Sequence, residues 1–225
     1  MRTPALFFVG CCITICAAQM LAGDSQQPSQ PQTQQQPQAP KTIHQLFLED
    51  QQQIPGAANG LSRLSPEEYE KLLKDREAQV RTLLAAGELK TGDDFEEAAF
   101  IFQHGNDAEH CLFAHVLAME AVVKGNLSAR WIAAATLDRY LQSIKQRQVF
   151  GTQYPLDPNL AHPVANAQSA PFLSGRTLEP YDKQFLPDFV RLDFCVPTLA
   201  QQEQNVTMFN AGERPKTLKA PGCNR

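Results

Sequence analysis

Glycines divide the stretch from Asp93 to Gln153 into consecutive amphipathic segments, and this pattern constrains the fold more than any other feature of the chain. Gly105 and Gly125 each end a segment in which small and apolar residues recur at the spacing of one helix face. The stripes consist of Phe95, Ala98, Ala99 and Phe102, then Cys111, Ala114, His115, Ala118 and Val122, then Trp131, Ala134, Ala135, Asp138 and Leu141. The pattern therefore predicts three successive helices.

Two further helices are predicted before this stretch. Ser65 is followed by Pro66 and, three places after the serine, by Glu68, which is the pattern of an N-cap with a capping box. A shorter helix is expected over 41–53, because apolar residues there follow helical spacing and Pro55 stops the run.

The predicted fold is mainly α. Short connections between the helices favour a compact helical bundle of four to five helices. We also expect a small β element near 148–154 and a second extended piece over 189–196. Gly92 and Gly125 each precede an alanine-rich helix at a spacing close to the period of tetratricopeptide arrays, so a short helical-repeat array is the alternative.

The N-terminal 23 residues have the pattern of a secretory signal peptide. Arg2 supplies positive charge, residues 5–18 are almost entirely apolar, and small residues follow. We therefore expect a secreted or periplasmic protein, with an N-terminal membrane anchor as the alternative and no stable membrane insertion after signal cleavage.

The rest of the chain divides by composition. Residues 24–41 are rich in Gln, Pro and Ser, which predicts a disordered linker. We expect the helical domain over 42–199 and a poorly ordered tail over 200–225, where apolar residues are sparse. The formal net charge of −4 and the absence of a basic run argue against a nucleic-acid partner. An unknown protein or a small polar ligand is the expected partner.

Three cysteines remain after signal cleavage. Export implies an oxidising compartment, and Cys195 and Cys223 both lie in the loop-rich C-terminal part, so they form a possible disulfide. Cys111 lies on an apolar helix stripe and is expected to be a buried free thiol. Neither a Cys-x-x-Cys nor a His-Glu-x-x-His motif occurs, so we predict no metal and no cofactor.

His104 and Asp138 are the candidate catalytic residues. His104 is expected at a helix C-terminus, where the helix dipole favours the imidazolium form. Asp138 lies on an apolar stripe, where a carboxylate is costly unless it is paired, and Arg139 is one possible partner. One interpretation is therefore a buried structural pair, and His115 is similarly explained as a core histidine with a satisfied hydrogen bond.

The alternative interpretation is a polar pocket that binds a small polar ligand. It would also permit acid/base chemistry with His104 as the base and Asp138 as its orienter. The residues of this hypothetical pocket are Asp50, Gln51, His104, Asp138 and Gln153.

Four short motifs stand out among the polar residues. They are Asp50-Gln51, Gln103-His104-Gly105-Asn106, Asp138-Arg139 and Phe150-Gly151-Thr152-Gln153. Together they resemble a bacterial domain family of unknown function that has Gln-His-Ala-Asp, Asp-Arg and Tyr-Gly-Thr-Gln motifs. Asn106 stands where that family has an acid, and Phe150 stands where it commonly has tyrosine. The resemblance implies a shared fold and no particular activity.

The function predicted from these features is a binding or interaction module of the cell envelope or exterior. The alternative is a hydrolase-like or small-polar-ligand-binding domain that uses a pocket around His104 and Asp138. The sequence contains no Gly-x-Ser-x-Gly elbow, phosphate-binding loop or dinucleotide fingerprint. Whether the protein is an enzyme therefore stays open at this point.

Overall fold

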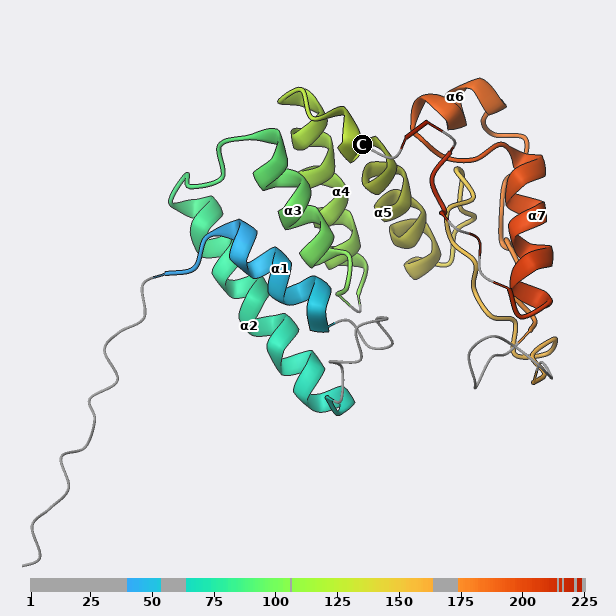
Figure 1. Cartoon of the computed structure of the whole chain (residues 1–225), viewed down its shortest axis with the longest axis horizontal. Coiled ribbons are helices and arrows are strands. Elements are labelled where there is room, and N and C mark those ends of the chain that lie inside the picture. Colours follow the sequence, from blue (N-terminus) through green and yellow to red (C-terminus); the bar gives the residue numbers. More distant parts are fainter. Residues whose placement is uncertain are drawn as a thin grey trace, which may run out of the picture. The chain divides into compact units, whose positions relative to one another are not determined.

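The computed structural model describes residues 40–53, 64–105, 107–163, 174–213, 215, 217–220 and 222–223. Their secondary structure is helical (Figure 1), which confirms the prediction of a mainly α fold. The helices are α1 (Ile43–Gln53), α2 (Pro66–Ala85), α3 (Gly92–Phe102), α4 (Ala108–Val123), the 3-10 helix η1 (Leu127–Ala129), α5 (Arg130–Ser143), α6 (Asp188–Asp193) and α7 (Leu199–Asn210). The expected signal peptide, most of the expected linker and Asn106 lie outside the described residues.

Side-chain caps fix where the long helices begin. The Ser65 hydroxyl accepts a hydrogen bond from the backbone N–H of Glu68, and the Glu68 carboxylate accepts one from the backbone N–H of Ser65. This is the predicted capping box of α2. Thr91 caps α3 in the same way, and the Asp107 carboxylate accepts from the backbone N–H of His110 at the start of α4.

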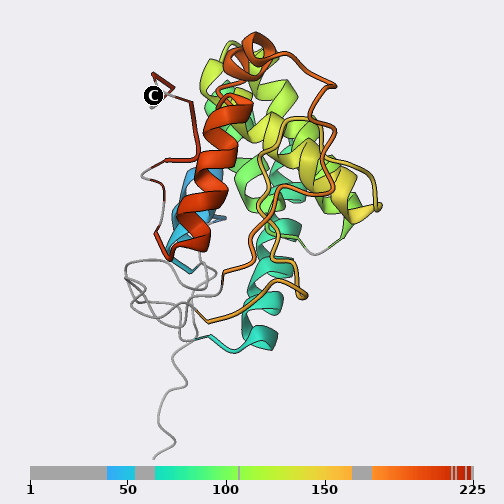
Figure 2. The same cartoon turned by 90° about the vertical axis from the view of Figure 1, so that its right-hand side faces the viewer.

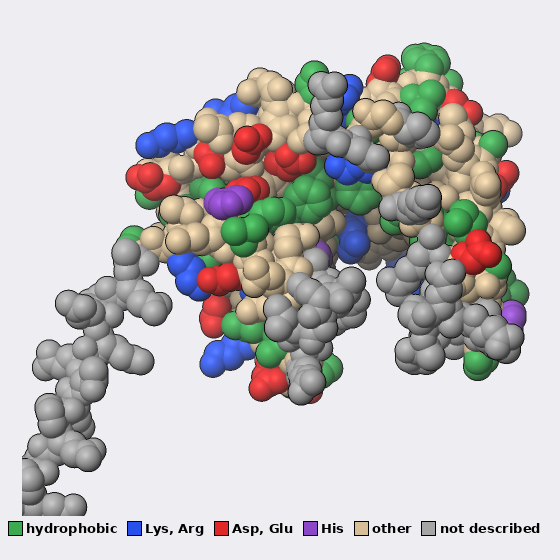
Figure 3. Space-filling view, in the orientation of Figure 1, with side chains coloured by type: hydrophobic (Ala, Val, Ile, Leu, Met, Phe, Trp, Pro, Cys, Tyr) green, Lys and Arg blue, Asp and Glu red, His purple; other side chains and the backbone are tan. Residues whose placement is uncertain are grey.

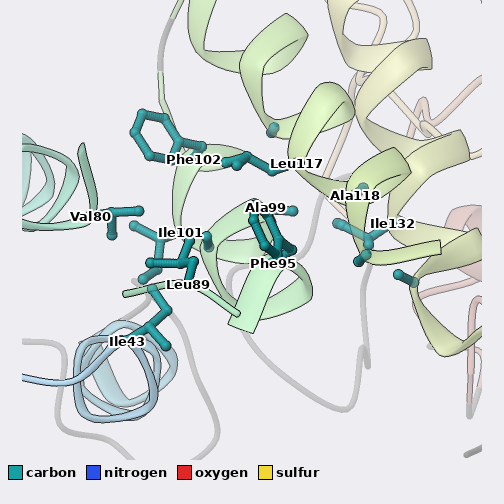
Figure 4. Close-up of a cluster of buried hydrophobic side chains, with 14 of the residues drawn as sticks. Ile43, Val80, Leu89, Phe95, Ala99, Ile101, Phe102, Leu117, Ala118 and Ile132 are labelled. Carbon is teal, nitrogen blue, oxygen red and sulfur yellow. The ribbon is translucent and has the colours of Figure 1, made fainter. Parts of the chain in front are cut away.

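The main hydrophobic core lies where α3 packs against α1 and α4, and where α4 packs against α5. Large side chains such as Ile101, Phe102 and Ile132 are buried in it (Figure 4). Between them lie alanines with no exposed surface, which allow the helix backbones to approach closely: Ala98, Ala99, Ala114, Ala118, Ala121 and Ala133. The amphipathic stripes of the sequence therefore form this core.

The expected β element near 148–154 is wrong, because the described residues contain no β-strand. Gln148 forms only an isolated bridge with Tyr181, although the segments 144–163 and 174–187 run side by side (Figure 2). The backbone N–H groups of Val149 and Phe150 donate to the Asp138 carboxylate instead of to a neighbouring strand. A side chain thus takes the hydrogen bonds on which a strand would depend.

Two further expectations are corrected in the C-terminal part. Within the expected extended piece 189–196, residues up to Asp193 belong to α6, and the apolar residues Phe189 and Leu192 are exposed. Residues 200–210, expected in a poorly ordered tail, belong to α7, which begins with a capping box between Thr198 and Gln201.

A disulfide joins Cys195 to Cys223, and the backbone N–H of Ala220 donates to the Cys195 carbonyl. The chain beyond α7 is therefore fastened back to the end of α6. In the described part of the chain, none of the helices combines the length and apolar character needed to cross a membrane.

Candidate functional site

The Asp138 carboxylate organises the loop that follows α5. It has no exposed surface and accepts four hydrogen bonds of 2.8–3.0 Å, from the backbone N–H groups of Val149, Phe150 and Thr152 and from the Thr152 hydroxyl. Burial raises the pKa of Asp138, and these hydrogen bonds oppose that shift. Asp138 therefore pins the loop to α5.

Each residue of the segment 150–153 has a separate structural role. Phe150 packs with Phe194 and Val196 in a second, smaller core. Gly151 has a φ of +82°, and a Cβ atom there would collide with the Gln202 side chain, so only glycine fits. Gln153 then donates from Nε2 to the Ala135 carbonyl at 3.2 Å, which places it beside α5.

A cavity of about 450 Å³ lies against this loop, and we call it the α5 pocket. Trp131, Ala135 and Arg139 line it from α5, at positions that fall on one face of the helix. The other lining residues come from the end of α3, from two loops, from α7 and from the C-terminal segment: Gln103, Thr152, Gln153, Tyr154, Arg176, Phe209, Pro215 and Leu218. Figure 3 shows basic and hydrophobic side chains meeting in a hollow of the surface.

The two arginines of the α5 pocket have few partners. Arg139 donates to the Gln103 carbonyl over a long 3.4 Å, and Arg176 donates to the Tyr154 carbonyl at 2.9 Å. Within the described residues neither forms an ion pair, whereas Arg76 and Arg191 pair with aspartates. The Arg139 side chain is solvent-accessible but surrounded by protein, and this desolvation lowers its pKa. A guanidinium remains charged in proteins, so the pocket holds two uncompensated positive charges.

The pocket also has an apolar part, formed by Trp131, Phe209 and Leu218, and some of its polar groups are already hydrogen-bonded. The Trp131 indole N–H donates to the Leu218 carbonyl at 3.2 Å, which ties the C-terminal segment to α5. Tyr154 packs on Phe209 with ring centroids 5.2 Å apart, and its hydroxyl accepts from Asn205. Burial raises the pKa of Tyr154, so its phenol stays neutral.

A second polar cluster surrounds Asp50 between α1 and α2. Asp50 has no exposed surface, and its carboxylate accepts hydrogen bonds of 3.0 Å from both Arg76 and Gln51. Arg76 also donates to the Gln53 side chain. His104 Nδ1 lies 3.0 Å from Asp50 Oδ2, although the two atoms do not form a hydrogen bond.

The structure thus separates the residues of the hypothetical polar pocket into two groups. Asp50, Gln51 and His104 lie together, whereas Asp138 on α5 and Gln153 on the following loop lie beside the α5 pocket. His104 contacts Asp50 and not Asp138, whose two oxygens are occupied by the 149–152 backbone and Thr152. The His104–Asp138 acid/base pair is therefore not formed.

His115 and Cys111, both considered from the sequence, each have a structural role. His115 Nδ1 hydrogen-bonds the Ala133 carbonyl at 2.9 Å. Cys111 is a buried free thiol whose pKa is raised by burial. Glu77, on α2, lies 2.9 Å from His110 Nε2, and burial raises its pKa. Among the described residues, no group of three or more His, Cys, Asp or Glu side chains is arranged to hold a metal ion.

The arginines of the α5 pocket were missed as site residues. Arg139 was considered only as a partner of Asp138, although its spacing from Trp131 and Ala135 places all three on one helix face. No local pattern marks Arg176, which reaches the pocket from an irregular loop. Arg76, the buried partner of Asp50, was also missed, although it stands one turn from the apolar positions Leu73 and Val80.

Comparisons with protein-family models, curated proteins and solved structures find no match to this chain.

Proposed function

We propose that this chain is an exported binding protein whose small ligand occupies the α5 pocket. The observation that carries the proposal is that one cavity of about 450 Å³ holds two arginines that have no acidic partner among the described residues. Small-molecule sites are typically concave, of this size, and lined by apolar side chains with a few convergent polar groups. The pocket is concave and of this size, and its lining combines polar side chains, two arginines among them, with apolar surface from Trp131, Phe209 and Leu218.

Binding is favoured over catalysis by the chemistry of the pocket lining. General acid/base or nucleophilic catalysis needs a group such as His, Cys, Asp or Glu within reach of the substrate. The described lining residues include none of these types, and the Thr152 hydroxyl already donates to Asp138. The lining instead supplies fixed positive charge and apolar surface.

Export is supported by two independent features. The N-terminal segment has the charge and apolar pattern of a secretory signal. The Cys195–Cys223 disulfide is of a kind that persists in oxidising compartments outside the cytosol. We propose a secreted or periplasmic location on this basis.

We also propose that the chain shares a compact helical bundle with the uncharacterised bacterial family that it resembles. Support comes from the continuous core between Ile43 and Ile132, which joins α1 to α5. The motif residues also have structural roles that explain their types: Asp50 pairs with Arg76, Asp138 pins a loop, and Gly151 has a positive φ.

Thermal unfolding with a panel of small organic acids, amides, sugars and amines tests the binding proposal. A ligand at about 100 times its dissociation constant adds roughly 2.7 kcal/mol to the free energy of unfolding. We expect at least one compound to raise the melting temperature, and Arg139→Gln or the pocket-filling Ala135→Leu to abolish that rise. Arg147→Gln is the matched control, since Arg147 is exposed and does not line the pocket. A panel without any stabilising compound, or a rise that survives both variants, contradicts the proposal.

A further inference from the structure

The α5 pocket also indicates the class of its ligand, an inference that rests on the proposed binding function. We infer that the ligand is an organic anion, in which one carboxylate or phosphate group is attached to an apolar, preferably flat, body. Arg139 and Arg176 bind the anionic group together, and the surface of Trp131, Phe209 and Leu218 contacts the body.

The anionic end follows from the hydrogen-bonding capacity of the two guanidinium groups. Each guanidinium has five N–H donors in a planar fork. Among the described residues Arg139 uses a donor only in the long contact to Gln103, and Arg176 uses one toward Tyr154. The remaining donors suit the paired oxygens of a carboxylate or phosphate, which arginine binds in a bidentate manner.

The charge of the pocket favours an anion over a neutral polar ligand. Its described lining contains two arginines and no acidic residue. The Arg139 side chain is exposed to solvent, but the protein around it desolvates it enough to lower its pKa, and an incompletely solvated charge gains from an opposite charge beside it. A bound anion supplies that missing partner, whereas a neutral amide or sugar of the same size does not.

The apolar body follows from the aromatic and aliphatic part of the lining, Trp131, Phe209 and Leu218. The indole N–H of Trp131 is taken by the Leu218 carbonyl, and the Tyr154 hydroxyl oxygen accepts from Asn205. The Gln153 amide N–H groups donate to Ala135 and Thr152. These N–H donors are therefore not available to hydroxyls along the ligand, and the aromatic and aliphatic surfaces favour an apolar body over a sugar.

The closing experiment is isothermal titration calorimetry with four probes: phenylacetate, phenyl phosphate, phenylacetamide and inorganic phosphate. We expect phenylacetate or phenyl phosphate to bind at least ten-fold more tightly than phenylacetamide, which has the same body without charge. We also expect phenyl phosphate, if it is the better of the two, to bind at least ten-fold more tightly than inorganic phosphate. The relative affinities of the two aromatic anions then tell which oxyanion group the site prefers.

Variants assign the binding to the two arginines. Arg139→Gln and Arg176→Gln should each weaken binding of the preferred probe at least ten-fold, and Arg147→Gln should leave it unchanged. If either glutamine variant does not fold, the corresponding lysine variant takes its place, because it keeps the positive charge. This variant should bind the preferred probe more weakly than the wild-type protein does. Its affinity for that probe should still exceed the affinity of the wild-type protein for phenylacetamide.

Two outcomes overturn the inference while leaving the binding function standing. In one, phenylacetamide binds as tightly as phenylacetate, so charge is not recognised. In the other, inorganic phosphate binds as tightly as phenyl phosphate, so the apolar body is not recognised. Failure of all four probes also overturns the inference, and the broader stabilisation panel described above then decides whether the pocket binds another class of ligand.

Discussion

Replacing Asp138 with asparagine should loosen the loop that forms one wall of the α5 pocket. The carboxylate uses Oδ1 to accept from Val149 and Phe150, and Oδ2 to accept from the Thr152 N–H and hydroxyl. An asparagine keeps an acceptor on one side only. Its NH₂ group faces the Thr152 N–H, so that buried donor loses its partner.

The expected cost follows from these contacts. A buried donor left without a partner costs roughly 1–3 kcal/mol, and the two retained bonds lose their charge assistance. Removing a desolvated charge, whose pKa is raised by burial, offsets part of this cost. We expect a net loss of about 2–3 kcal/mol in the free energy of unfolding, and thus a fall of about 4–12 °C in melting temperature.

Differential scanning calorimetry of Asp138→Asn beside Asp75→Asn measures this effect, since Asp75 is exposed on α2. The same samples should show weaker binding of the preferred anionic probe for Asp138→Asn, because Thr152, Gln153 and Tyr154 lie on the loop that Asp138 holds. Equal melting temperatures for the two variants would refute the assignment of Asp138 as the anchor of this loop.

Three further predictions concern parts of the fold away from Asp138. Burial raises the pKa of Glu77, so folding favours its protonated form. The stabilisation that this shift gives to the folded state is therefore fully present below about pH 4.5 and is lost as the pH rises through the folded-state pKa. Wild type should therefore lose stability relative to Glu77→Gln between pH 4 and pH 7 in urea unfolding, and a constant difference would contradict this. Reducing the Cys195–Cys223 disulfide, which has a sequence separation of 28, should cost roughly 3–4 kcal/mol and weaken probe binding, because the reduced tail no longer holds Leu218 in the pocket wall. Unchanged affinity after reduction would show that the tail is held by other contacts. Asp107→Ala removes the N-cap of α4 and should cost about 1 kcal/mol, measured by chemical denaturation, with Asp75→Ala as the control.

Much of the helical architecture was predictable from local patterns. The apolar stripes marked the faces that pack in the core, and the Ser65-to-Glu68 capping box marked the start of α2. The burial of Asp138 was also predictable, because an acidic residue on an apolar stripe has to face the interior. In each case the determining interactions lie within one or two turns of a single helix.

The α5 pocket was not predictable, because it depends on contacts between segments far apart in the sequence. Val149 and Phe150 have strand-forming side chains, but their N–H groups are taken by Asp138, so they do not join a sheet. Arg176 reaches Tyr154 and the pocket through the packing of two irregular loops. The sequence alone also does not separate Asp50 from Asp138, because the distance between the two carboxylates depends on how the helices pack.

If Arg139 and Arg176 bind one anion together, both side chains must respond to the same binding event. Titration of phenylacetate or phenyl phosphate into ¹⁵N-labelled protein can be followed through the arginine side-chain Nε–Hε resonances. We expect the resonances of Arg139 and Arg176 to shift along saturating curves with a single dissociation constant, while that of Arg147 stays in place. Shifts in only one of the two arginines, or different dissociation constants for them, would contradict a shared anion site.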